Sequence, residues 1–249
     1  MKKILSISCA IIGVVFVGMN GAFAAPTPKD ILQRADEARG NLEGVQWRVH
    51  VQSIEKNLES ERLLDVKARG YDFLAIVLAP PKAKRQKILM VNHNMWFTKP
   101  GLRKPVPISS RQKLVGGAAY GDIAATNYAD DYHPNLLGTE AVNEEMCYVF
   151  DLQAATKKAT YDRIKYWVSR ERTVGVKAEY YTVSGKIFKR ATFEYKNRVR
   201  LKNKSHPFIS KITFYDALVA SDITTMIFSK GQIVKVPPST LDLNLFMMR

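Results

Sequence analysis

The densest group of side chains that could do chemistry is Asp130-Asp131-Tyr132-His133, with Asp122 upstream. Two carboxylates beside an imidazole could bind a metal ion or share a proton. Adjacent residues of an extended chain point to opposite faces, however, and a single histidine in a loop is more often structural or exposed. The sequence also contains no G-x-S-x-G, H-E-x-x-H, C-x-x-C or glycine-rich phosphate-binding motif. We therefore predict no catalytic residue, no metal site, no cofactor and no enzyme.

The two cysteines, Cys9 and Cys147, do not predict a reactive site. A thiol becomes a nucleophile beside a base or a positive charge, whereas Cys147 lies in an apolar run and is expected in the core. Cys9 lies in an N-terminal run that we expect to be cleaved off. The mature chain would then hold one cysteine and no internal disulfide.

Basic side chains are more informative. Lys196, Arg198, Arg200, Lys202 and Lys204 occupy every second position, so an extended chain would place all five on one face. Such a face could contact anionic lipid, at about 1 kcal/mol per residue, or could be a charged strand edge that prevents aggregation. We assign contact with an anionic surface to the last four of these residues. Two further basic clusters are Lys82, Lys84, Arg85 and Lys87, and Arg103, Lys104, Arg111 and Lys113.

Large aromatic side chains recur on successive predicted strands. They are Trp47, Tyr71, Phe73, Trp96 and Phe97. On a curved sheet they could line an apolar concave face, which is a sensible binding site for an acyl chain. Ordinary core packing is the alternative for each of them.

The elements that must position these residues are mostly strands. Thr27 and Asp30 form a capping box with Pro28 between them, which predicts one short amphipathic helix ending near Gly40. Apolar and polar residues then alternate from residue 45 to 52, as on a half-buried strand. Further strands are predicted over 62–67, 71–78, 87–91, 95–98, 146–152, 161–169, 176–183, 187–195, 208–215 and 224–230. The predicted fold class is mainly β with a few short helices (α+β): one antiparallel sheet of about ten strands, curved around the helices as an incomplete barrel.

The N-terminus predicts export. Lys2 and Lys3 precede an apolar run over residues 4–19, and Ala22-Phe23-Ala24 has the pattern of a signal-peptidase site. We expect residues 1–24 to be a signal peptide cleaved after Ala24, residues 25–249 to form a single domain, and the periplasm to be the location. The formal net charge of +15 favours anionic partners such as membrane headgroups. Nucleic acid is not expected as a partner there.

Several stretches resemble one known family. In chain order they are Met95-Trp96-Phe97-Thr98-Lys99-Pro100, Gly116-Gly117, Gly121-Asp122-Ile123, Cys147-Tyr148-Val149-Phe150-Asp151-Leu152, Tyr166-Trp167-Val168 and Val176-Lys177-Ala178-Glu179-Tyr180-Tyr181. This pattern is similar to the LolA-like outer-membrane lipoprotein-sorting proteins, as a broader sister group. The resemblance implies a strongly curved, incomplete β-barrel covered by helices. It also implies a periplasmic carrier of lipoproteins or other acyl lipids, with an inner-membrane exporter and an outer-membrane receptor as partners.

Residues 116–131 are rich in glycine, alanine, aspartate and tyrosine. A carrier must release its cargo, so we predict a mobile lid here, with Tyr120, Ile123, Tyr128 and Tyr132 as its apolar contacts. A non-catalytic envelope scaffold, or an accessory protein of an exporter, is the alternative function. A carrier predicts an apolar cavity and bound lipid, whereas a scaffold predicts a filled core and a specific protein partner.

Overall fold

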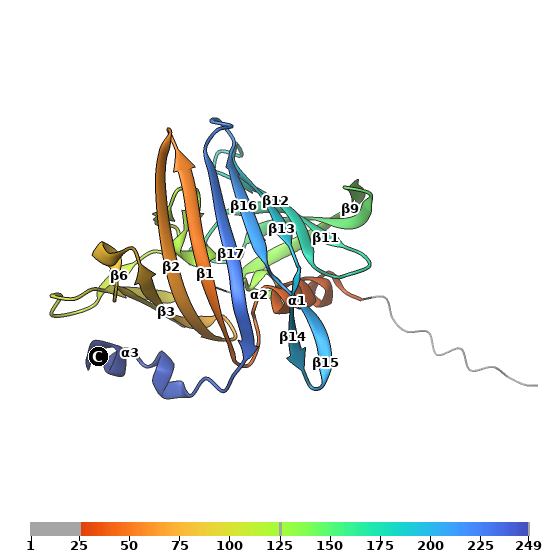
Figure 1. The fold of residues 1–249 in the computed structure, drawn as a ribbon. Helices are drawn as coiled ribbons and strands as arrows, with labels where there is room; N and C mark the ends of the chain where they lie inside the picture. The colour runs from red at the N-terminus through yellow and green to blue at the C-terminus, as the bar shows by residue number, and fades with distance from the viewer. Residues whose placement is uncertain (1–25, 125, 249) are drawn as a thin grey trace, which may run out of the picture.

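A computed structural model describes residues 26–124 and 126–248, and it is dominated by one antiparallel sheet (Figure 1). The sheet has thirteen strands in the order β6-β5-β4-β3-β2-β1-β17-β16-β13-β12-β11-β10-β9. These strands are β1 (Val45–Glu55), β2 (Leu58–Arg69), β3 (Asp72–Ala79), β4 (Lys87–Val91), β5 (Asn94–Thr98), β6 (Val106–Ile108), β9 (Tyr132–Val142), β10 (Glu145–Ala154), β11 (Arg163–Ser169), β12 (Gly175–Tyr181), β13 (Ile187–Glu194), β16 (Lys211–Asp216) and β17 (Ile223–Ile233). In chain order β1 is the first strand of this sheet and β17 is the last, and the two pair with each other in the middle of the sheet.

Shorter elements complete the described chain. Two small hairpins are β7 (Lys113–Val115) with β8 (Ala118–Ala119), and β14 (Asn197–Leu201) with β15 (Lys204–Phe208). The α-helices are α1 (Pro28–Ala38), α2 (Tyr128–Asp131) and α3 (Leu243–Met248), and the 3-10 helices are η1 (Pro81–Ala83), η2 (Tyr120–Asp122) and η3 (Pro238–Leu241). The edge strands β6 and β9 do not pair with each other, so the curved sheet stays open. The predicted fold class is confirmed. The predicted signal peptide and Cys9 lie outside the described residues.

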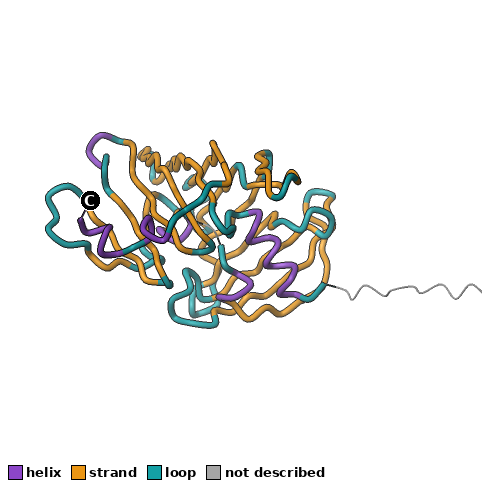
Figure 2. Tube along the Cα trace, turned by 90° about the horizontal axis from the view of Figure 1, so that it is seen from below, coloured by secondary structure: helices purple, strands orange, loops and turns teal. Residues whose placement is uncertain are grey.

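Helix α1 forms as its sequence predicts. The Thr27 backbone N–H donates to the Asp30 carboxylate at 2.9 Å, and the Asp30 N–H donates to the Thr27 hydroxyl at 3.2 Å. These bonds satisfy N–H groups that the first turn of a helix leaves without partners. Ile31, Leu32 and Ala35 are buried, and the helix lies within the curve of the strands when viewed from below (Figure 2).

The main core lies between the concave face of the sheet and helices α1 and α2. Along β1 the buried apolar residues are Val45, Trp47, Val49 and Val51, which confirms the predicted alternation. The outer face of β3 and β4 is covered by the C-terminal segment, where Val236, Leu241 and Phe246 pack with Leu89, partly buried Leu74 and partly buried Trp96. This second layer explains why the third predicted strand is apolar on both faces.

Two-residue turns join several neighbouring strands. Lys56–Asn57, Asn92–His93, Asn143–Glu144 and Lys202–Asn203 all have positive φ at both positions, between 47° and 67°. This geometry matches the twist of an antiparallel pair, and asparagine tolerates it better than most residues. The strands predicted over the ranges of β4 and β5, β12 and β13, and β16 and β17 pair as hairpins.

The prediction of one extended basic face over residues 196–204 is wrong. The chain reverses at Lys202–Asn203, so Arg198 and Arg200 lie on β14, Lys202 lies in the turn and Lys204 begins β15. The asparagine at the turn was the local signal for this hairpin. Strand β9 was also missed, because most of its residues are exposed and it therefore lacks an alternating pattern.

Candidate functional site

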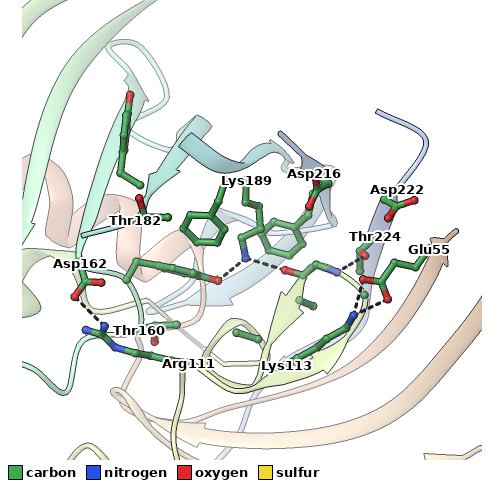
Figure 3. A pocket seen from close by; sticks show the side chains of 18 of the residues that line it. Glu55, Arg111, Lys113, Thr160, Asp162, Thr182, Lys189, Asp216, Asp222 and Thr224 are labelled. Atoms are coloured by element: carbon green, nitrogen blue, oxygen red, sulfur yellow. Dashed lines mark hydrogen bonds and ion pairs between the residues drawn. The ribbon is translucent and has the colours of Figure 1, made fainter. Parts of the chain in front are cut away.

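A cavity of about 520 Å³ opens at the end of the sheet where the hairpins β1–β2, β12–β13 and β16–β17 turn (Figure 3). The strands β12, β13 and β16 form one wall, and the β7–β8 hairpin and residues 160–162 form the other. Aromatic side chains supply most of the apolar lining: Tyr161, Tyr181, Phe188 and Phe214. Polar side chains line the rim, among them Glu55, Arg111, Lys113, Asp162, Asp216 and Asp222.

Lys189 projects from β13 into this cavity, although its side chain is only 5% exposed. Its Nζ lies 4.1 Å from the centre of the Phe214 ring and 4.5 Å from that of Tyr161. The ammonium donates to the Gly117 carbonyl at 2.9 Å, to the Asp122 carboxylate at 3.2 Å and to the Tyr161 hydroxyl. Burial lowers the pKa of Lys189, and the charge of Asp122 opposes that shift. With these three hydrogen bonds, every hydrogen of the ammonium has a protein acceptor.

Asp122 lies beside Lys189, just outside the cavity lining, and connects three separate segments. Its Oδ2 accepts the Ala119 N–H at 2.9 Å and the Tyr161 hydroxyl at 2.7 Å, in addition to Lys189. Burial and the neighbouring Asp122 carboxylate raise the pKa of Tyr161, so this hydroxyl stays protonated and can donate. The turn after β8 is thus attached to β13 and to the segment before β11 through buried, charge-assisted bonds.

The β7–β8 hairpin lies directly on the sheet. Gly116 has φ of +53°, and a Cβ there would lie 2.0 Å from the Ser53 Oγ and 2.2 Å from the Thr224 Oγ1. Only glycine accommodates both the backbone conformation and this close approach. The Gly117 N–H donates to the Thr224 hydroxyl at 2.7 Å, and Lys113 pairs with Glu55 on β1. These contacts form the cavity wall that faces β13.

The arrangement is suited to binding. Aromatic walls can take up an apolar chain, and the charge of Lys189 at the cavity floor is already neutralised by Asp122. Arg111 and Asp162 pair at 2.8 Å beside the rim, so two more charges there are also compensated. Among the described residues, no three histidine, cysteine, aspartate or glutamate side chains gather as metal ligands would.

The aromatic residues predicted to line a cavity lie elsewhere. Trp47 and Phe73 are fully buried in the main core, and Trp47 meets Phe208 edge-on at 6.1 Å. Tyr71 and Phe97 are partly buried against the same core, whereas Trp96 packs with the C-terminal segment. None of the five lines the cavity of about 520 Å³. Their contact with a ligand stays a prediction.

The predicted lid residues all pack on the main core. Ile123, Tyr128 and Tyr132 are buried, and Tyr120 is partly buried. Tyr128 meets Tyr132 and Tyr166 edge-on, at 5.2 Å in both cases. The Asp36 carboxylate of α1 fastens this segment by accepting the Thr126 hydroxyl at 2.6 Å and the Ala129 N–H at 2.9 Å.

The acidic cluster of the sequence is divided between different partners. Asp130 pairs with Lys29 at 2.7 Å, the Asp131 carboxylate accepts a hydrogen bond from the His93 ring at 2.7 Å, and Asp122 bonds to Lys189. Cys147 is buried on β10, and burial raises the pKa of its thiol. The thiol is therefore not activated as a nucleophile.

Sequence reasoning missed Lys189 and Tyr161 as site residues. A signal was present for Lys189, because it is in phase with Ala191 and Phe193, which both point into the core. A lysine at an inward position of a strand needs a partner or a cavity.

The curved open sheet is shared with known structures. A LolA superfamily protein from Nitrosomonas europaea matches with a TM-score of 0.78 at 29% sequence identity, over 88% of this chain and 98% of that chain. Residues 70–243 also match a family model described as "Uncharacterized protein". The chain belongs to that family and has the LolA-like fold.

Two matches of lower sequence identity support the fold alone. A domain from Vibrio parahaemolyticus described as an outer membrane lipoprotein-sorting protein is 17% identical, with a TM-score of 0.75 over 88% of this chain and 97% of that one. A DUF1329 family protein from Desulfovibrio piger is 16% identical, with a TM-score of 0.72 over 87% of this chain and 96% of that one. No curated protein matches the sequence of this LolA-like chain.

Proposed function

We propose that this LolA-like protein is a periplasmic carrier or binding protein for lipoproteins or other acyl lipids, and that it does not act as an enzyme. The observation that carries the proposal is the cavity of about 520 Å³ with aromatic walls, formed on the curved sheet that this family shares. Apolar lining supplies the affinity for an acyl chain, at about 25 cal/mol per Å² of area buried.

The size of the cavity limits what it holds in this conformation. A volume of about 520 Å³ lies within the range of sites for one drug-sized ligand, roughly 300–1,000 Å³. One acyl chain fits such a volume, whereas a lipoprotein with three chains needs more. The deeper space between sheet and helices is filled by Trp47, Phe73 and Tyr166. A larger cargo therefore requires that residues 116–131 move away from the core, as the lid hypothesis proposes.

The same proposal includes the cellular setting. Cleavage after Ala24 would release residues 25–249 into the periplasm as one lipid-binding domain. An inner-membrane exporter would deliver the cargo and an outer-membrane receptor would take it. In the part of the chain that the structure describes, no helix has the length and apolarity to cross a membrane.

The test is native mass spectrometry with lipid extraction, on protein purified from periplasm without detergent. A stoichiometric acyl lipid or lipoprotein fragment is the expected result. A protein that carries no lipid, and takes up no added fluorescent fatty acid, would overturn the proposal in favour of an envelope scaffold or an accessory of an exporter.

A matched pair of variants places the ligand. Thr182 lines the rim of the cavity at the end of β12, so Thr182→Trp fills the mouth and should weaken uptake of the fatty acid about tenfold or more. Thr192 is exposed on the outer face of β13, so Thr192→Trp should leave uptake unchanged. Equal uptake by both variants would place the ligand outside this cavity.

A further inference from the structure

Three hairpin tips at one end of the molecule expose apolar side chains. Leu58 follows the β1–β2 turn and is 74% exposed, Val183 lies in the β12–β13 turn at 87%, and Leu218 lies in the β16–β17 turn at 89%. These hairpins are neighbours in the sheet, in the order β2-β1-β17-β16-β13-β12. Their tips therefore form one rim, at the top of Figure 1.

The rim surrounds the mouth of the cavity. Glu55, Val183 and Asp222 belong to the tips and also line the cavity. Two aspartate side chains hold the β1–β2 and β16–β17 tips in place. Asp216 accepts the N–H groups of Leu218 and Val219 at 2.8 and 2.9 Å, and Asp222 accepts the N–H of Lys56 at 3.0 Å. The β16–β17 loop thus holds Leu218 outward, and Asp222 joins two of the three tips.

The rim carries side chains of both charges. Lys56 and Lys186 are exposed beside the apolar tips, and neither forms an ion pair within residues 26–124 and 126–248. Glu55 is compensated by Lys113. Asp216 and Asp222 accept backbone N–H groups but keep their negative charge, and Glu59 is exposed beside Leu58. The attraction to an anionic surface therefore comes from the charge of the whole chain, which is +15.

We propose that this rim is a membrane-docking surface. Leu58, Val183 and Leu218 enter the boundary between headgroups and acyl chains of an anionic bilayer, while Lys56 and Lys186 meet lipid phosphates. The cavity mouth then faces the bilayer. The orientation rests on the proposed function, because it would bring the cavity to the membrane that supplies or takes up the lipid. Docking itself requires no bound lipid. The basic β14–β15 hairpin lies at the opposite end of the molecule from the rim, and would therefore point away from the bilayer (Figure 1).

Flotation of the purified protein with vesicles of phosphatidylcholine and phosphatidylglycerol tests the surface. The variant Leu58→Asn/Val183→Asn/Leu218→Asn should lose about a hundredfold in its partition coefficient, since each half-covered apolar side chain contributes roughly a factor of five. Pure phosphatidylcholine vesicles should bind the wild type more weakly. All three residues are exposed, so an unchanged thermal unfolding curve confirms that the variant is folded.

A matched control removes equally apolar, exposed side chains elsewhere. Leu136, Leu137 and Met146 are 44%, 54% and 46% exposed on β9 and β10, and their replacement by Asn should leave flotation unchanged. Loss of flotation in this control, or in Arg198→Ser/Arg200→Ser but not in the tip variant, would overturn the proposal. So would a wild type that binds no vesicle while its tips capture an exporter protein.

Uptake of a fluorescent fatty acid in solution separates the two proposals. A tip variant that takes up the fatty acid but does not float supports docking as a step distinct from cargo binding. A wild type that floats yet takes up no fatty acid would leave docking in place and remove the carrier function.

Discussion

Replacing Lys189 with methionine should destabilise the protein by about 3 kcal/mol. The Lys189 and Asp122 side chains are 5% and 7% exposed, so the variant leaves a carboxylate in the interior without its cation. Breaking a buried pair in this way costs roughly 3–5 kcal/mol. The lower end applies here because Asp122 keeps two donors, the Ala119 N–H and the Tyr161 hydroxyl.

Urea unfolding followed by tryptophan fluorescence measures this cost, in a double-mutant cycle with Asp122→Asn. The double variant has no buried charge at the floor, so it should be more stable than the sum of the two single variants predicts, by about 1–3 kcal/mol. As a control, Lys211→Met removes a half-exposed partner of Glu194 and should cost less than about 1 kcal/mol. A cost below about 1 kcal/mol for Lys189→Met, with additive single variants, would refute the view that this pair fastens the β8 turn to the sheet.

Two further predictions concern the segment above the core. Burial raises the pKa of Asp36 from 3.8 to about 7, so the folded state binds this proton more tightly than the unfolded state does. Stability should therefore fall as the pH rises from about 4 to about 7, by at most about 1.4 kcal/mol per pH unit, and urea unfolding of Asp36→Asn should lack that part of the slope. If residues 116–131 form a lid, hydrogen exchange should be faster at the Ala129 amide than at Val49 in β1. Equal protection of both amides would exclude a lid that opens independently of the sheet.

The strands were predictable wherever one face is buried. Alternation is strong in β1, where Val45, Trp47, Val49 and Val51 are all buried, and the capping box of α1 is local in sequence. Strands cannot be predicted from hydrophobic alternation where burial does not impose a pattern on the sequence. Strand β9 is mostly exposed, and the turn of the β14–β15 hairpin is obscured because basic residues alternate across it as on one extended face. The pairing of β1 with β17 joins the two ends of the chain and has no local signature.

The candidate site was less predictable than the fold, because its parts come together only in three dimensions. Asp122, Tyr161 and Lys189 lie far apart in sequence, and each looks ordinary within its own segment. The inward phase of Lys189 was a readable signal, but its partners were not. Likewise, exposure of Leu58, Val183 and Leu218 follows from the order of the hairpins in the sheet, which the sequence pattern alone does not provide.

The chemistry of the floor and of the rim together determines how an acyl lipid would enter. The three hydrogens of the Lys189 ammonium already bond to Gly117, Asp122 and Tyr161, so the floor has no free cationic donor for a headgroup. A headgroup taken inside would lose water without gaining a partner, which costs several kcal/mol for a charged group. The rim, in contrast, holds Lys56 and Lys186 in solvent. Under the proposed function, the acyl chain therefore enters tail first along Phe188 and Phe214, and the headgroup stays at the mouth, on the side that faces the bilayer.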